Sequence, residues 1–452
     1  MPPGKQGGVK VLALDLGTSS ARAVVWEGAH AGGRVVALAR RQVRLGVDDA
    51  GRAELDPDEY LDGLTACLDE VHDHLDGVRA VATSCQWHSL LALDAAGRPV
   101  TPLLTWADTR AQEAYTESPT TGELHRRTGA WRHPLYWTVR IPWLEERLGG
   151  GDRSRSFAGL AEYVFRRLLG EPAASVSMAS GTGLLDLAAG CWDGEAMALA
   201  GVTEDRLPPL APRGWTGTLE SRWARRWPAL RGVPWLPAVG DGAAATIGGG
   251  CAGPDRISVT VGTSAAVRVA HPLAGAFTLP GGCWRYLVDH DLAVTGIAYS
   301  AGGNVFAWAR RTLLLPDDVE AALVALGDRL GEGPPHGLTA VPDLAGARPP
   351  RPASTGSISG LTLGTGPVEI LAALLDGVSG QIAAGVRTLA EALPERPAAV
   401  VLGGGAMAAS GWWRRNLTLR LAVPVEPEAE AEASAMGVIR LAETVTAGRA
   451  VM

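Results

Sequence analysis

The sequence has little of what nucleic-acid-binding, membrane or secreted proteins need. Its formal net charge is −7 over 452 residues, and no basic run occurs, which excludes a dedicated surface for nucleic acid or anionic lipid. Nowhere do about 18 apolar residues follow one another, so we expect no transmembrane helix. The segment Met1–Lys10 contains no apolar stretch of signal-peptide length. We therefore expect a cytoplasmic protein.

Cysteine is also scarce. Five cysteines are scattered along the chain without a CxxC pair, so we expect neither a disulfide framework nor structural zinc. The hydrophobic content of 46% and charged content of 20% are typical of a globular protein. The chain is longer than a single hydrophobic core usually supports, which indicates two or three domains.

Near the start of the chain, a small glycine turn joins two runs of strand-forming residues. The first run ends on Asp15, and the second begins after Gly17, Thr18 and Ser19, which predicts a β-hairpin. Backbone N–H groups in such a turn can approach an anion closely. We therefore expect the turn to bind phosphate, with Asp15 reaching a metal ion on that phosphate. An ordinary hairpin turn with a capping Asp would have the same pattern.

A second copy of this design lies far along the chain. Between Arg256 and Val269, two strand-like runs flank Gly262, Thr263 and Ser264. A unit that recurs in this way indicates two similar lobes. The second copy has Val261 where the first has a carboxylate, so only one lobe offers a ligand for a cation. Two such hairpins facing each other would form a clamp for a nucleoside triphosphate.

The junction between the lobes is expected where the chain is proline-rich and irregular, over Arg206–Pro212 and Trp227–Pro237. This places an N-terminal domain over residues 1–236 and a C-terminal domain over residues 237–452.

A cluster of polar and aromatic residues follows the short apolar run Val78–Ser84, which predicts a buried strand. Its carboxyl end is the edge where α/β proteins bind ligands. An indole plate with forked donors and acceptors suits a small polyhydroxylated ligand, although a buried polar network that ties strands together would use the same residue types. The candidate residues are Gln86, Trp87, His88, Trp106, Asp108 and Arg110.

Three glycine-rich turns in the second half complete the candidate site. Asp241 stands between two glycines, placed for close approach by a ligand, and its alternative reading is a helix N-cap. Gly303 and Asn304 lie in a turn that enters a helix. A strand then runs into Gly403, Gly404, Gly405 and Ala406, where bare backbone can receive a base or ribose. We expect the last helix, which begins near Glu430–Gly437, to pack beside this turn.

Taken together and in this order, these segments resemble the FGGY carbohydrate kinases of the actin/hexokinase/Hsp70 superfamily. The most specific stretches are Gln86-Trp87-His88-Ser89 and Trp106-Ala107-Asp108-Thr109-Arg110, and Gly240-Asp241-Gly242-Ala243 looks like the segment of the family's catalytic Asp. The resemblance implies an α/β fold of two RNase H-like domains, as in actin-like ATPases, with a central cleft between them. Within the family, the motifs look most like those of gluconokinases.

The resemblance implies ATP-dependent phosphorylation of a hydroxyl on a small sugar, sugar acid or polyol. Asp241 would be the catalytic base and a substrate ligand, and Asp15 would hold Mg²⁺, mostly through water. The implied substrate ligands also include Gln86, Trp87, His88, Trp106, Asp108, Arg110 and Asn304. The implied ATP-binding residues are Gly17, Thr18, Ser19, Gly262, Thr263, Ser264, Gly303, Gly403, Gly404, Gly405 and Ala406.

Some residues depart from the family pattern. Arg140 stands where the first signature usually has Lys, and Tyr136 and Trp137 stand where smaller residues are usual, so the substrate remains open. A xylulokinase-type ketopentose kinase or a cyclitol kinase is the alternative among enzymes. A non-catalytic regulator that binds nucleotide or sugar on the kinase scaffold is the alternative from another class. We expect a monomer or homodimer that binds a small-molecule substrate.

Overall fold

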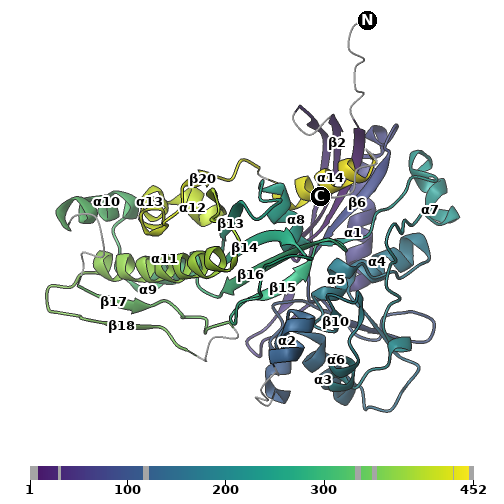
Figure 1. Ribbon diagram of the computed structural model, residues 1–452, viewed down its shortest axis with the longest axis horizontal. Helices are drawn as coiled ribbons and strands as arrows, with labels where there is room; N and C mark the ends of the chain where they lie inside the picture. The colour runs from purple at the N-terminus through teal and green to yellow at the C-terminus, as the bar shows by residue number, and fades with distance from the viewer. Residues whose placement is uncertain are drawn as a thin grey trace, which may run out of the picture.

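Two mixed β-sheets, each flanked by helices, form two lobes that lie side by side along the long axis of the molecule (Figure 1). The computed structural model describes residues 9–28, 32–115, 122–330, 337–348, 354–430 and 432–446. Residues 1–8, within the segment from which we expect no signal peptide, lie outside the described residues.

The first sheet has the order β12-β6-β1-β2-β3. β1 (Val9–Leu16) and β2 (Ser20–Gly28) form the antiparallel hairpin predicted from the sequence, and β3 (Arg34–Gln42) extends it. β6 (Ala80–Cys85) pairs in parallel with β1, and β12 (Val239–Gly240) pairs in parallel with β6. The apolar runs in β1 and β6 are buried, as expected for strands covered on both faces.

The second sheet repeats this arrangement, with the order β15-β16-β14-β13-β19-β20. Its β13–β14 hairpin is the second predicted copy, extended by antiparallel β16, and β19 and β20 add in parallel on the other side. The α/β fold with two similar lobes is therefore confirmed. The strands are β13 (Arg256–Val261), β14 (Ala265–Pro272), β15 (Trp284–Leu287), β16 (Leu292–Tyr299), β19 (Ala399–Gly403) and β20 (Val425–Pro427).

Helices cover the faces of both sheets. Asp56 caps the first of them, α1, because its carboxylate accepts from the backbone N–H groups of Asp58 (2.9 Å) and Glu59 (3.0 Å). The first lobe contains α1 (Pro57–Glu70), α2 (Gly122–Thr128), α3 (Trp137–Arg147), α4 (Leu160–Leu169), α5 (Val176–Ser180), α6 (Gly194–Ala200), α7 (Ser221–Arg226) and α8 (Asp241–Gly248). The remaining helices are α9 (Gly303–Thr312), α10 (Val319–Leu330), α11 (Pro367–Ala392), α12 (Gly405–Ala409), α13 (Gly411–Arg420) and α14 (Ala433–Thr446).

Short strand pairs brace the periphery. They are β4 (Gly46–Val47), β5 (Ala53–Leu55) and β8 (Leu103–Leu104), β7 (Leu91–Leu93) with β9 (Ser156–Ala158), β10 (Leu185–Asp186) with β11 (Cys191–Trp192), and β17 (Thr339–Val341) with β18 (Ser357–Ser359).

Helix α11 is long and apolar enough to cross a membrane by length and composition alone. More than half of its apolar window is buried inside the molecule, where Leu371, Leu375 and Ile382 join the core of the second lobe. Its apolar character is therefore explained by its position as a core helix.

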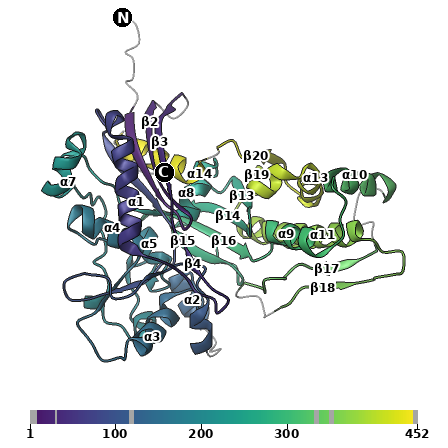
Figure 2. The same ribbon diagram turned by 180° about the vertical axis from the view of Figure 1, so that it is seen from behind.

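The first lobe extends beyond the expected boundary between residues 236 and 237. β12 pairs with β6, and α8 joins the core of the first lobe. α14 also returns to this lobe, where it packs on α8, β1 and β6. Both views show α14 beside α8 (Figures 1 and 2). This corrects the expectation that the last helix packs beside Gly403–Gly405. The small residues of α14 do permit tight packing, but the element they pack against is α8.

We expect Gly437→Ala to destabilise the protein, because a Cβ at Gly437 would lie 1.9 Å from the carbonyl oxygen of Ala244 on α8. Overpacking of this kind costs about 1–3 kcal/mol, which should lower Tm by several degrees. Gly380→Ala on α11 is the matched control, since no atom lies within 4 Å of its Cβ position and Ala favours a helix. Equal Tm values for the two variants would contradict the α8–α14 contact.

Candidate active site

Three parallel strands bring the predicted acidic residues to one edge of the first sheet. Leu16 of β1 pairs with Cys85 of β6, which pairs with Gly240 of β12. Asp15 and Asp241 therefore stand at the carboxyl ends of strands that are two sheet positions, about 10 Å, apart. The sequence segments that carry them are separated by more than 200 residues, and the sheet brings them to a common edge.

Asp241 is the first residue of α8, and its carboxylate accepts a hydrogen bond of 2.7 Å from the backbone N–H of Gly242. Burial and the charge of Asp15 raise its pKa to about 6, against the opposing effect of Arg268. A carboxylate with this pKa is a stronger base than an ordinary Asp and is still ionised at neutral pH. Asp241 can therefore accept a proton from a neighbouring hydroxyl.

Asp15 is buried among charged side chains of both signs: Arg22, Glu432 and Arg40 all act on it electrostatically. Arg22 Nη1 contacts Asp15 at 3.2 Å and also pairs with Glu432 at the start of α14. Burial raises the pKa of Asp15, and Arg22 partly opposes that effect. Within the described residues no group of three or more His, Cys, Asp or Glu side chains gathers around a metal position. Asp15 fits a Mg²⁺ ion that keeps most of its water and is bound mainly through phosphate.

The side chain of Thr18 turns toward the predicted substrate residues. Its hydroxyl donates to Gln86 Oε1 (3.0 Å) and accepts from Trp106 Nε1 (3.0 Å). Within the turn, the backbone N–H of Gly17 donates to Ser20 O (3.1 Å), so the N–H groups of Thr18 and Ser19 are the ones left for phosphate. The hydroxyl of Thr18, one of the implied ATP-binding residues, is occupied. Gln86 Nε2 is buried without a hydrogen-bond partner in the described part of the chain, so it offers a donor for a ligand.

The glycine-rich turns of the second lobe converge at the carboxyl ends of β13 and β19. Gly303 N donates to Gly262 O (2.7 Å), and Asn304 N donates to Thr263 O (3.1 Å). The Cβ position of Gly303 lies 3.5 Å from the Cβ of Ala406. Gly404 has φ +98° and lies against the backbone of β13, a conformation and closeness that require glycine. The predicted nucleotide residues of this lobe are thus brought together, with Ser264, Gly403 and Gly405 in the same turns.

Asn304 does not present a free side chain. Its Oδ1 accepts from Gly302 N and its Nδ2 donates to Ser300 O, both at 2.9 Å. The amide therefore holds the turn that opens α9, which favours a structural role over the substrate contact that we expected.

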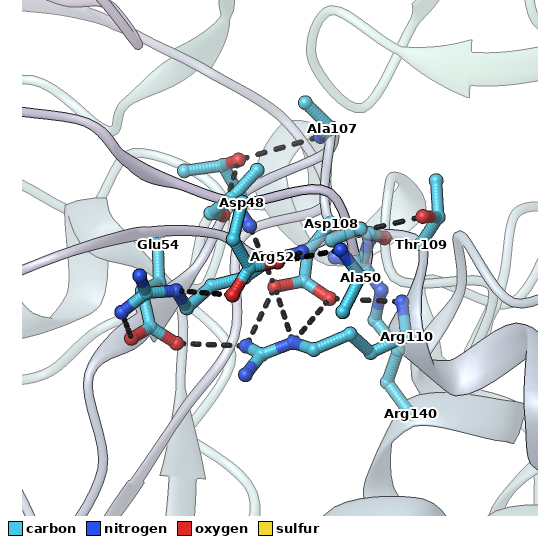
Figure 3. A network of polar contacts seen from close by, with 12 residues as sticks. Asp48, Ala50, Arg52, Glu54, Ala107, Asp108, Thr109, Arg110 and Arg140 are labelled. Atoms are coloured by element: carbon cyan, nitrogen blue, oxygen red, sulfur yellow. Dashed lines mark hydrogen bonds and ion pairs between the residues drawn. The ribbon is translucent and has the colours of Figure 1, made fainter.

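Asp108 and Arg110 are paired with each other (Figure 3). The Asp108 carboxylate is almost fully buried and also accepts from the backbone N–H of Ala53 (3.0 Å), and Arg110 reaches Glu54 (2.7 Å). This is the polar network that the sequence left as an alternative to substrate binding. It ties the turn after β8 to strand β5.

Trp87 supports the turn that carries Asp241. Its Nε1 donates to Ser177 O (3.0 Å), and its ring fills the space beside Gly240, where a Cβ would lie 1.8 Å from the indole. Trp87 is buried, so it contributes to the site by positioning backbone.

An aromatic cluster, consisting of Trp87, His88, Tyr136, Trp284 and Tyr286, joins the two lobes. Tyr136 of the first lobe and Tyr286 of β15 share a hydrogen bond of 2.6 Å between their hydroxyls. His88 has φ +66°, and its Nδ1 donates to Gly181 O (2.6 Å). Because burial lowers the pKa of His88 to about 3, the ring is neutral and Nε2 is left as an acceptor.

Comparison with known proteins identifies this arrangement. Residues 10–248 match the N-terminal domain of the FGGY family of carbohydrate kinases, and residues 257–444 match its C-terminal domain. The chain belongs to this family. The gap between the two matches begins at the end of α8, in agreement with the extent of the first lobe.

Relatives of this FGGY kinase have several names. It is 28% identical to a gluconokinase of Bacillus subtilis, over 90% of this chain and 82% of the relative. It is 27% identical to a glycerol kinase of Cereibacter sphaeroides, over 96% of this chain and 90% of that relative. A gluconate kinase structure from Lactobacillus acidophilus superposes with a TM-score of 0.88 at 24% identity, covering 98% of this chain and 90% of that one. A xylulose kinase structure from the same organism superposes with a TM-score of 0.86 at 24% identity, covering 97% of this chain and 90% of that one.

The family match and the two-lobed fold make the chain a carbohydrate kinase, a phosphotransferase with an alcohol group as acceptor. The specific substrate is not settled by these relatives, whose names differ.

Arg140, which departs from the family signature of this kinase, holds the residues around the aromatic cluster in place. Its guanidinium is fully buried and donates to the carbonyl oxygens of Pro134 (2.8 Å), His88 (2.8 Å) and Asp108 (2.7 Å). Burial lowers the pKa of Arg140 to about 10, so it remains charged at neutral pH. Trp137, the neighbouring departure, is buried and donates to Ser89 O (3.1 Å).

We expect Arg140→Met to lower Tm by many degrees, because each buried carbonyl left without a donor costs about 1–3 kcal/mol. Arg147→Met is the matched control, since Arg147 lies on the same helix and its side chain is half exposed. Thermal unfolding of both variants tests this, and an unchanged Tm for Arg140→Met would refute the structural role.

Proposed function

We propose that this kinase transfers the γ-phosphoryl group of ATP to a hydroxyl of a small sugar acid, sugar or polyol, in the manner of a gluconokinase. The observation that carries the proposal is the common sheet edge of Asp15 and Asp241, one beside the phosphate-binding turn and the other with a raised pKa. Phosphoryl transfer requires mainly positioning and charge neutralisation, and this edge supports both.

On this proposal, Asp241 orients the attacking hydroxyl. It accepts the hydroxyl proton late in the reaction, when the forming bond to phosphorus has drawn electron density from the oxygen and made that proton acidic. His88 Nε2, Gln86 Nε2 and Trp106 bind the acceptor. Asp108 and Arg110 act indirectly, since their side chains hold the loop that carries Trp106. The hydrogen bonds of Asn304 give it the same kind of supporting role.

ATP would lie between the two glycine turns. The backbone N–H groups of Thr18–Ser19 and Thr263–Ser264 would receive its β- and γ-phosphates, while those of Gly17 and Gly262 close their own turns. Gly303 and Gly403–Ala406 would flank the adenosine. Asp15 would hold Mg²⁺ through water, and the ion would neutralise charge on the phosphates. Closure of the lobes would exclude water and prevent wasteful hydrolysis.

A coupled ADP-release screen over gluconate, xylulose, ribulose, glycerol and cyclitols tests this function. Release with gluconate supports the gluconokinase reading, and release only with a ketopentose or cyclitol supports the alternative kinases. Stabilisation by nucleotide and sugar without ADP release on any acceptor would favour a non-catalytic regulator. We further propose that the protein is cytoplasmic, which cell fractionation would test. We also propose that it is a monomer or homodimer, which sedimentation of the purified protein would test.

A further inference from the structure

Arg348 extends from the second lobe to a substrate residue of the first. It follows β17, and its guanidinium carbon lies 5.3 Å from the ring centroid of Trp106. Trp106 Nε1 also donates a hydrogen bond to the hydroxyl of Thr18, which lies in the turn proposed to bind phosphate. Arg348 is also close enough to His88, Tyr136 and Tyr286 to act electrostatically on all three. It therefore lies at the aromatic cluster, on the side of the site that receives the acceptor.

Arg268 is a second cation near the same place. It lies on β14, and its Nε is buried without a hydrogen-bond partner in the described chain. The Cβ position of Gly242, the neighbour of Asp241, is 3.3 Å from this Nε. Arg268 and Arg348 interact electrostatically with each other, and burial lowers the pKa of both.

Neither arginine has a carboxylate at ion-pair distance among the residues that the structure describes. Other partly buried arginines of this chain do, including Arg22 with Asp15 and Arg110 with Asp108. Placing two cations together in a partly desolvated site is unfavourable, and the charges of Asp241 and Glu428 offset this only in part for Arg268, whose pKa is still lowered. An anionic ligand that is bound during turnover would offset this cost.

We propose that Arg348 binds the carboxylate of a sugar-acid substrate, with Arg268 as the second cation of this subsite. This inference rests on the proposed function. The planar guanidinium suits a carboxylate through two parallel hydrogen bonds. The enzyme would then select aldonates over neutral sugars and over alditols of equal length. The subsite serves the acceptor rather than the nucleotide, because Arg348 lies against Trp106 and near His88 and not at the glycine turns of the second lobe.

The test compares gluconate with glucitol, in which a CH₂OH group replaces the carboxylate. For Arg348→Gln we expect kcat/KM on gluconate to fall about 10- to 100-fold, the effect of losing a charged hydrogen-bond partner. We expect kcat/KM on glucitol and KM for ATP to stay nearly unchanged. Arg348→Lys should recover part of the loss on gluconate. Arg387→Gln, at an exposed position on α11, is the matched control and should leave kcat/KM unchanged on both gluconate and glucitol.

A second readout separates this inference from the kinase reaction itself. Gluconate alone, without ATP, should raise the Tm of the wild type and should do so much less for Arg348→Gln. If that difference is seen but no acceptor releases ADP, the carboxylate subsite stands and the proposed function fails. If ADP is released with neutral acceptors as readily as with gluconate, or if Arg348→Gln raises KM for ATP, the subsite is overturned and the kinase proposal survives.

Discussion

Replacing Asp241 with Asn is expected to lower kcat by about 10²–10⁴-fold, the usual contribution of a general base, and to leave ATP binding nearly unchanged. The amide keeps the size and polarity of the side chain but cannot accept the proton of the attacking hydroxyl. Coupled ADP release gives kcat, and calorimetric titration with ATP gives the nucleotide affinity. Unchanged turnover would remove Asp241 from the catalytic role, and lost ATP affinity would indicate a structural one.

The pH dependence of the wild type gives an independent check. Because the pKa of Asp241 is raised to about 6, kcat/KM should rise with pH through a limb near that value. The unfolded chain releases this proton near the ordinary pKa of about 4, so the raised pKa lowers the stability of the folded wild type as pH rises from about 4 to 6. Asp241→Asn should therefore have a higher Tm than the wild type at pH 7.5, with the difference vanishing near pH 4.

Replacing Asp15 with Asn is expected to raise the Mg²⁺ concentration needed for half-maximal activity by about 10- to 100-fold, the range for groups that hold a metal through outer-shell contacts. The substitution removes the negative charge at the phosphate-binding turn and keeps the shape of the side chain. A Mg²⁺ titration of kcat at saturating ATP measures the effect. The Asp15→Asn substitution should also lower the pKa of Asp241, since the charge of Asp15 contributes to raising that pKa.

The control for Asp15→Asn is Asp62→Asn, at an exposed position on α1. Both variants lose one negative charge from the first lobe, so a general electrostatic effect would appear in both. A normal Mg²⁺ requirement in Asp15→Asn would contradict the assignment of this carboxylate to the metal.

The hairpins and the buried strands could be predicted because their signals are local. The apolar runs before Asp15 and before Gln86, and the repeated Gly-Thr-Ser turn, depend on alternation and turn residues within a short window. Each produced the expected strand, in β1, β6 and β13. The convergence of Asp15 and Asp241 is not a local signal: only the family resemblance implied it, and in the structure it depends on the pairing of β12 with β6.

The extent of the first lobe could not be read from the sequence because it depends on pairing between distant segments. The proline-rich stretch before residue 237 looks like a linker, yet β12 returns to β6, and Gly437 fits against Ala244. For Asp108 and Arg110, composition alone did not decide between a ligand site and a polar network. Only the contacts with Ala53 and Glu54 favour the network.

Arg268 and Arg348 were not identified as site residues from the sequence. Arg268 interrupts the apolar run 265–270 of β14, which is a usable signal, since a charge in a buried strand needs a partner or a function. Arg348 lies in an irregular stretch near β17 that has no motif. Its importance emerges only from its contact with Trp106 across the lobes.

The most direct test is a crystal structure of the wild type with Mg²⁺, a non-hydrolysable ATP analogue and gluconate. We expect the γ-phosphoryl group to lie between Asp15 and Asp241, a substrate hydroxyl to be within hydrogen-bond distance of Asp241, and the adenosine to rest on Gly403–Ala406. A nucleotide bound with its phosphates away from either carboxylate would contradict the role assigned to this edge of the sheet.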